Sequence, residues 1–283
     1  MRFRGPAIIS IILTMLMASH NLLAEDGSRI AIKINFSGNI FASAEKFTTG
    51  YYPAIGDVGI FDASNQMEYK FDPNFGKSFH GALCYKASKI IELELGAGYT
   101  SVPMEISQVS NYSFWGGSGY IVDSYEYGSQ KDANFSYVNI RPAVTFLIPT
   151  NSSVVPYFSV GMNIMMMKAK GSLDFAMSYV TEDAAYYYLW IGPDAHLEPL
   201  DFEGSQTVFG LDLGAGLEFK VTPVLSIDLG GAYLIQLQRA FKDFDEILEN
   251  QDAQDVFRII GYDFNGLNHS NFSFSLALKM HFH

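Results

Sequence analysis

The chain has 283 residues and a formal net charge of −12, with 17% charged, 48% hydrophobic and 15% aromatic residues. A soluble globular domain usually carries about a quarter charged residues, so this composition predicts a surface that does not face water everywhere. The acidic balance disfavours nucleic acid as a partner, because nucleic-acid binding rewards basic surfaces. The single cysteine, Cys84, excludes an internal disulfide framework.

The first two dozen residues have the three-part pattern of a secretory signal peptide. Arg2 and Arg4 precede an apolar run over residues 7–18, and a short segment ending at Ala24 follows. The run is about a dozen residues, short of the roughly 20 that a membrane-spanning helix needs. We therefore predict cleavage after Ala24, with Ala18 as the alternative position.

Removal of residues 1–24 takes away two arginines and no acid, which leaves the remainder, residues 25–283, more acidic still. In this remainder, apolar residues alternate strictly with small or polar ones in eight segments, as in strands with one apolar face. The segments lie at 30–40, 79–85, 91–99, 138–148, 157–166, 209–219, 225–233 and 272–282. We predict eight strands of roughly 9–14 residues, long enough to cross a bilayer when tilted.

The connections between these segments alternate between short and long. Those at 87–89, 149–153 and 220–223 are short, whereas those at 42–76, 101–134, 168–205 and 236–268 each exceed thirty residues. This pattern predicts an all-β fold, an eight-stranded antiparallel transmembrane β-barrel with short periplasmic turns and long extracellular loops, in the bacterial outer membrane. A soluble β-sandwich would also alternate, but its solvent face would be less rich in small residues and its apolar face less continuous.

The last segment ends like the C-terminal assembly signal of outer-membrane barrels, an alternating strand that finishes in an aromatic residue. Phe282 is next to last, and Met280, Leu278 and Leu276 share its face, although the final residue is His283 rather than phenylalanine. We expect two partners from this pattern. They are the barrel-assembly machinery, through the strand ending at Phe282, and outer-membrane lipid along the apolar faces.

The opposite faces of the segments carry charge. The predicted interior charges are Lys33, Glu92, Glu94, Arg141, Asp212, Glu218, Asp228 and Lys279, accompanied by His80 and His281. Unpaired charges are costly in a narrow interior, and an eight-stranded barrel has room for little more than side chains. We predict that the basic residues pair with some of the five carboxylates as a polar plug, with glycines leaving space for them. The alternative is a narrow, cation-preferring pore.

The long loops contain clusters of aromatic residues. The candidates for partner contact are Trp115, Tyr120, Tyr125 and Tyr127 in the second loop, and Tyr187 and Trp190 in the third. Aromatic loops on a rigid scaffold are a common basis for recognition, here of host-surface molecules, but the rings could equally pack onto the barrel rim. Other aromatic residues near strand ends, among them Phe135 and Tyr137, suit the girdles at the membrane interface.

No residue pattern indicates an enzyme, a cofactor or a metal site. Lipid A deacylases use a histidine and a serine two residues apart, whereas His269 and Ser270 are adjacent and therefore face opposite sides of a strand. The acidic stretch 243–255 lacks the glycine and alternating ligands of a calcium loop. Its apolar residues predict a short amphipathic helix instead. Met162 and Met166 are assigned to the lipid-facing stripe.

The overall pattern resembles the opacity-protein and OmpA-type barrel superfamily of Gram-negative outer membranes. Segments at 75–76, 81–85, 91–95 and 155–161 also look like the major surface antigen family of rickettsial-type intracellular bacteria. The resemblance implies an abundant surface-exposed antigen without catalytic residues, in some members with porin activity or a part in host-cell contact. We therefore expect a surface antigen or interaction protein that acts through its extracellular loops, with a narrow passive-diffusion porin of weak cation preference as the alternative.

Overall fold

The structure is a computed structural model that describes residues 29–41, 44–49, 52–55, 61–116, 121–176, 197–249, 251, 254 and 262–282. Within these residues the chain forms one antiparallel sheet of 12 strands. No helix of the described part is long and apolar enough to span a membrane. The predicted signal peptide, residues 1–24, lies outside the described residues.

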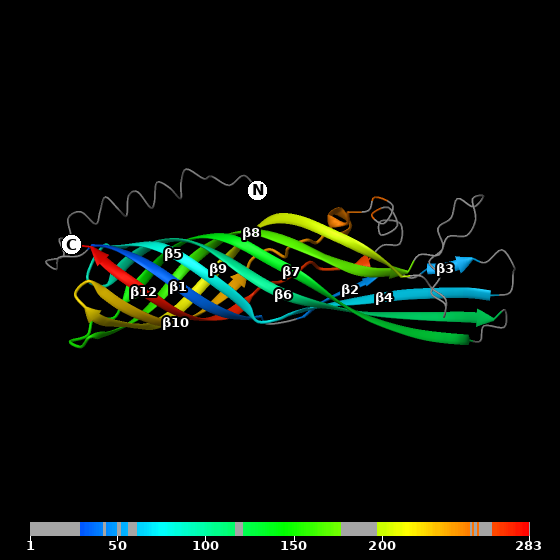
Figure 1. Cartoon of the computed structure of the whole chain (residues 1–283), viewed down its shortest axis with the longest axis horizontal. Helices are drawn as coiled ribbons and strands as arrows, with labels where there is room; N and C mark the ends of the chain where they lie inside the picture. The colour runs from blue at the N-terminus through cyan, green and yellow to red at the C-terminus, as the bar shows by residue number, and fades with distance from the viewer. Residues whose placement is uncertain are drawn as a thin grey trace.

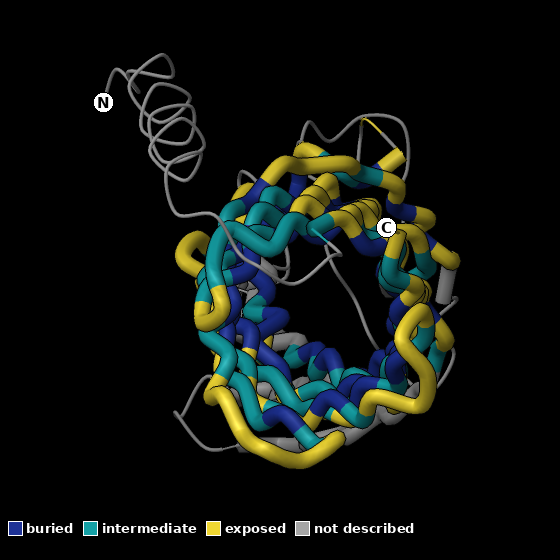
Figure 2. The backbone as a smooth tube through the Cα atoms, turned by 90° about the vertical axis from the view of Figure 1, so that its left-hand side faces the viewer, coloured by how far each residue is buried: buried dark blue, intermediate teal, exposed yellow. Residues whose placement is uncertain are grey.

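Eight of the strands close into a ring (Figures 1 and 2). In ring order they are β1 (Ile30–Phe41), β5 (Gly76–Lys86), β6 (Ile91–Gly116), β7 (Ile121–Leu147), β8 (Val154–Ala176), β9 (Leu197–Thr222), β10 (Leu225–Gln236) and β12 (Asn271–Phe282). The ring is closed because β1 pairs along its length with both β5 and β12. The predicted eight-stranded antiparallel barrel is thereby confirmed, and each alternating segment lies in one of these strands.

Four further strands extend the wall beyond this ring. They are β2 (Glu45–Thr49), β3 (Tyr52–Ile55), β4 (Phe61–Pro73) and β11 (Tyr262–Asp263). Strand β4 pairs with the outer half of β6, β2 and β3 pair with β4, and β11 pairs with β2. Much of the sequence expected to be loop is therefore strand, and β6 to β9 contain 23 to 27 residues rather than the predicted 9–14.

The strands are longer than predicted because the two-residue alternation continues beyond the apolar exterior stripe. There the apolar residues occupy the inward positions and the polar residues the outward positions. In β8 the outward Phe158 is exposed and the inward Asn163 is buried. From Met165 onward the inward residues Met165, Met167 and Ala169 are apolar and buried, whereas the outward residues Lys168 and Lys170 are charged and exposed. The end of the barrel with the short turns thus has an apolar exterior and a polar interior. The opposite end has a polar exterior and an apolar interior.

The reversal follows the strand register. The first polar outward residues of β5, β6, β7 and β8 are Lys77, Ser101, Ser136 and Lys168, which are paired in one continuous row. The row next to it, nearer the short turns, is apolar and contains Phe79, Tyr99, Val138 and Met166. We take this border as the outer limit of the membrane-spanning band.

An apolar core fills the barrel beyond this border. It includes Phe47, Phe71, Phe135, Phe202 and Phe244, each no more than 1% exposed. Part of it comes from the connection between β10 and β12, which supplies Phe241, Phe244, Leu248, Phe264 and Leu267. Phe241 (φ 54°) and Gly266 (φ 79°) adopt the left-handed backbone conformation at bends of this connection.

Two local predictions need correction. Over the first part of the acidic stretch 243–255, where a short amphipathic helix was expected, the chain forms a 3-10 turn, η2 (Phe244–Ile247), and Phe244 and Leu248 pack into the core. Gln251 and Gln254, further along the stretch, are helical. Phe135 and Tyr137, assigned to an aromatic girdle, face inward and are buried, and the outward positions next to them are Ser136 and Val138. Tyr99 and Tyr233 do lie on the exposed exterior.

The polarity border predicts how the exterior tolerates charge. Leu213 lies outward within the apolar band of β9 and is 43% exposed. Leu213→Arg should lower the free energy of unfolding in lipid by about 2–4 kcal/mol, because the guanidinium enters hydrocarbon. Ser205→Arg, on the same face of β9 and paired with Lys168 in the polar row beyond the band, should cost less than about 1 kcal/mol. Urea unfolding in lipid vesicles, followed by the heat-dependent shift in gel mobility, measures both variants, and equal losses would contradict the assigned border.

Candidate functional site

The polar interior of the membrane-spanning band is the candidate site. The structure places all eight of the predicted interior charges on inward positions, and their ion pairs form a network of two groups, one around Arg141 and Lys33 and one around Lys279. Their strands are β1, β6, β7, β9, β10 and β12, so six of the eight ring strands contribute. Each member is buried or nearly so, which makes pairing a condition of folding.

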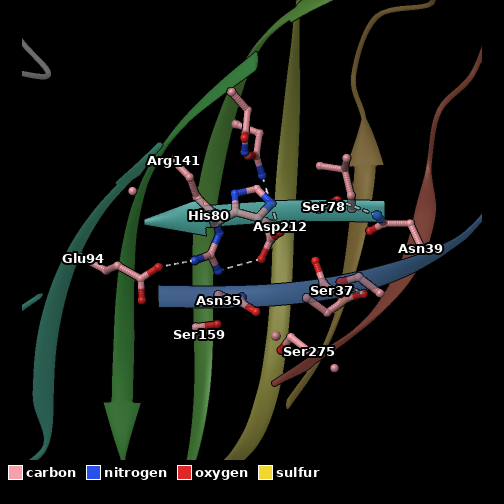
Figure 3. Close-up of a pocket in the computed structure, with 18 of the residues that line it drawn as sticks. Asn35, Ser37, Asn39, Ser78, His80, Glu94, Arg141, Ser159, Asp212 and Ser275 are labelled. Carbon is pink, nitrogen blue, oxygen red and sulfur yellow. Dashed lines mark hydrogen bonds and ion pairs between the residues drawn. The ribbon is translucent and has the colours of Figure 1, made fainter. Parts of the chain in front are cut away.

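Arg141 of β7 is the centre of the network (Figure 3). Its Nη1 atom donates to Oε1 of Glu94 at 2.6 Å, and its Nη2 atom donates to Oδ1 of Asp212 at 2.8 Å. The rigid guanidinium thus joins β6 to β9 across the intervening strands, an arrangement that a lysine could not reproduce with the same two-point geometry.

Lys33 and Lys279 are direct partners in the β1–β12 register, yet they bind different carboxylates. The Nζ atom of Lys33 lies 2.7 Å from Asp228 and 3.7 Å from Glu94. It also lies 5.5 Å from the centre of the Tyr157 ring. Because adjacent ammonium groups repel, division of the carboxylates between them lets both charges remain buried side by side.

Lys279 is the centre of the second group of ion pairs, which lies nearer the short turns. Its Nζ atom donates to both oxygens of Glu92, at 2.8 and 2.7 Å, and to Oε2 of Glu218 at 2.8 Å. These bonds connect β12 with β6 and β9 across the lumen. The imidazole Nε2 of His281 lies 2.9 Å from Oγ of Ser226 and 3.7 Å from Glu218, which completes this group.

Glycines make the space for these long side chains. A Cβ atom at Gly98 would lie 2.0 Å from Nδ1 of His80, and one at Gly216 would lie 2.5 Å from the Tyr157 hydroxyl. The predicted role of interior glycines thus has a direct geometric basis at these two positions.

A polar chamber of about 90 Å³ lies beside the Arg141 group (Figure 3). Uncharged residues that sequence reasoning missed line it, among them Asn39, Ser78, Asn139 and Asn163. Asn139 donates to Asn163 at 2.6 Å, but the Oδ1 atoms of Asn35 and Asn139 are buried and have no protein partner. A water needs about 10–15 Å³ of such volume, so a few waters fit here and can satisfy both oxygens. These residues could have been found from the sequence, because they are the polar residues at inward positions of the alternating segments.

The chemistry of this interior is that of a structural plug. Five carboxylates face three permanent cations, and each carboxylate has a basic partner within 4 Å. Among the described residues, no three histidine, cysteine or acidic side chains are grouped so as to hold a metal ion. Cys84 is buried on the inward face of β5, as its alternation predicts.

His269 and Ser270 are held apart in the outer core. The ring of His269 packs 5.6 Å from that of Phe135 and 6.0 Å from that of Phe41, and its Nε2 atom is buried without a partner. The Ser270 hydroxyl instead donates to Oδ1 of Asn268 at 2.7 Å. Burial lowers the pKa of His269 to about 4, so the ring is neutral at pH 7.

Three of the predicted recognition aromatics lie near the outer end of the sheet. Trp115 belongs to β6, and Tyr125 and Tyr127 belong to β7, so these three are strand residues rather than the loop residues that were expected. Their side chains are outside the described part of the structure, as are Tyr120, Tyr187 and Trp190 entirely. Their role in partner contact stays a prediction.

Comparison with known proteins agrees with this architecture. The family model described as outer membrane protein beta-barrel domain matches residues 36–279. Neisserial surface protein A is 15% identical, with 91% of this chain and 100% of that chain covered and a TM-score of 0.38. OprG from Pseudomonas aeruginosa is 11% identical, with 91% and 97% covered and a TM-score of 0.44. Ail of Yersinia pestis is 13% identical, with 90% and 99% covered and a TM-score of 0.33. No curated protein sequence matches significantly.

Removal of Lys279 tests the contribution of its ion pairs to stability. Lys279→Met leaves Glu92 and Glu218 buried without their main partner and should lower the free energy of unfolding by about 3–5 kcal/mol. The triple variant Lys279→Met/Glu92→Gln/Glu218→Gln should recover most of that loss, because no unpaired charge remains. Urea unfolding in lipid vesicles compares the variants, and a triple variant as unstable as the single one would contradict the ion-pair explanation.

Burial of His269 predicts a stability loss in acid. Its ordinary pKa of 6.5 in the unfolded chain exceeds its folded value of about 4, so protons favour the unfolded state between these pH values. The penalty is absent above about pH 7 and reaches roughly 3 kcal/mol at pH 4. His269→Leu should remove this part of the pH dependence. Thermal unfolding of both proteins between pH 7 and 4 measures it, and parallel curves would contradict the assignment.

Proposed function

Because the chain belongs to the outer membrane protein β-barrel family, we propose that it acts at the cell surface through its outer hairpins and not as a channel. In barrels of this class the short turns face the periplasm and the long connections face outward. The apolar core and the hairpins beyond it then form the extracellular end, and the barrel serves to anchor and orient them.

The observation that carries this proposal is the filled outer lumen. Phe47, Phe135, Phe202 and Phe244 pack inside the barrel beyond the membrane band, and Phe244 comes from the long last connection. The ion-pair network obstructs the lumen a second time within the membrane. A solute would have to displace both an apolar core and buried salt bridges, which disfavours passive diffusion.

The outer hairpins offer a surface for recognition. Beyond the barrel, β4 pairs with β6 up to Gly116, and β6 pairs with β7 up to Ile121. These paired strand ends are the outer hairpins, and they form the part of the sheet that extends furthest from the short turns (Figure 1). In this sheet Tyr112 pairs with Tyr125 in the backbone register, and Tyr127 lies two positions further along β7. An aromatic row of this kind suits contact with a host-surface molecule, since aromatic residues dominate binding hot spots.

The proposal includes no enzymatic activity, because the paired interior and the separated His269 and Ser270 offer no nucleophile with a base. The resemblance to the major surface antigen family of rickettsial-type bacteria agrees with a surface role. We further propose lipid contact along the apolar exterior, and assembly through β12, whose Phe282 pairs with Ile30 where the ring closes.

Whole-cell binding tests the surface role. In a Gram-negative strain that displays the protein, Tyr125→Ala/Tyr127→Ala should reduce adherence to cultured host cells by about tenfold, because two aromatic anchors are lost. The matched variant Ser124→Ala/Glu126→Gln changes the alternate positions of the same stretch of β7 and should retain adherence. Flow cytometry of labelled bacteria gives the readout.

Equal adherence of all three strains, or hairpins inaccessible to protease on intact cells, would contradict the surface proposal. Resolvable single-channel currents from the purified protein in planar bilayers would favour the alternative, a narrow porin with weak cation preference.

A further inference from the structure

The short-turn end of the barrel contains a second cavity, of about 370 Å³, distinct from the polar chamber. It opens below the Lys279 group, and its lining includes Glu92, Glu218, Lys279 and His281 at its inner end. This volume falls within the range of about 300–1,000 Å³ that small-molecule sites occupy. Nothing in the proposed surface role uses this end of the molecule.

The rim of this cavity is basic in a chain whose net charge is −12. Lys86 and Lys220 end inward-facing rows of β5 and β9, and Lys89 lies in the turn between β5 and β6. Arg29 adjoins this rim, because its carbonyl accepts a hydrogen bond from the Lys86 N–H at 2.8 Å. Within the described residues, none of these four side chains forms an ion pair.

The lack of pairing has a structural cause. Lys86 is the register partner of Glu92, the nearest acidic position on β6, but both oxygens of Glu92 accept bonds from Lys279. Glu218 lies one inward position from Lys220 on β9, and its Oε2 atom also binds Lys279. The buried lysine therefore occupies the acidic groups that the rim lysines would otherwise bind, and their positive charge remains directed at the cavity.

We propose that this cavity is a binding site for a water-soluble anion bearing phosphate or carboxylate groups. Lys86, Lys89 and Lys220 supply three ammonium groups from different segments. Charge-assisted hydrogen bonds from such groups are the stronger class in proteins. An anion here would neutralise a cluster whose members repel one another.

The geometry favours a soluble ligand over a lipid headgroup. Lys86 and Lys220 occupy inward positions, whereas their outward neighbours Tyr85 and Val221 face the side where lipid would lie. A headgroup would have to cross the rim to reach the cavity, but a periplasmic solute enters it directly. The basic rim also repels cations at the mouth of the barrel, in opposition to the cation preference of the alternative porin function.

Calorimetric titration with inorganic pyrophosphate tests this inference, using the full-length protein in discs of zwitterionic phosphatidylcholine. We expect saturable binding that Lys86→Gln/Lys220→Gln weakens by about tenfold or more, since two charge-assisted contacts are lost. The variant Lys168→Gln/Lys170→Gln removes the same charge from the outer surface and should bind like the wild type. Lys89→Gln, in an exposed turn, should weaken binding without perturbing any strand.

Absence of saturable binding, or equal weakening by the inner and outer lysine pairs, would overturn the site. A second titration uses discs that contain phosphatidylglycerol. Unchanged pyrophosphate affinity supports a soluble ligand, whereas competition by the lipid would overturn that source and assign the phosphate to a headgroup. The heat-dependent gel shift verifies that each variant is folded, independently of the adherence experiment.

Discussion

Closure of the ring between β1 and β12 is the constraint on which the rest of the structure depends. In hydrocarbon every backbone polar group must bond within the protein, and only a sheet without edges achieves this with strands. Closure in turn creates an interior too narrow for solvated charge. The buried carboxylates are then tolerable only because Lys33, Arg141 and Lys279 reach across the lumen to them. The network is a consequence of closure and also reinforces it, since it ties together six strands.

The membrane-spanning half of this fold was readable from the sequence because two-residue alternation reports directly on which face meets lipid. The interior charges followed from the same parity, and Lys33, Arg141 and Lys279 lie where it placed them. Which carboxylate each would bind could not be derived, because partners such as Glu92 and Lys279 are 187 positions apart and their approach depends on strand tilt and register.

The outer half was misjudged for a physical reason. Its strands keep the alternation but bury the opposite class of residue, so Phe135 has the parity of an interior residue and the chemistry of an exterior one. A search for lipid-facing stripes ends where that stripe ends and assigns the remainder to loops. The last connection could not be predicted either, because its phenylalanines pack against several strands at once and define no period of their own.

The row of outward residues from Lys77 to Lys168 also fixes the depth of the molecule in the bilayer. A displacement inward by two residues would draw these ammonium groups into hydrocarbon, whereas the reverse displacement would expose Phe79, Val138 and Met166 to water. Both movements are opposed, so the barrel has one preferred position along the membrane normal. The outer hairpins are therefore held at a constant distance from the bilayer surface, and a binding partner would meet them at that distance.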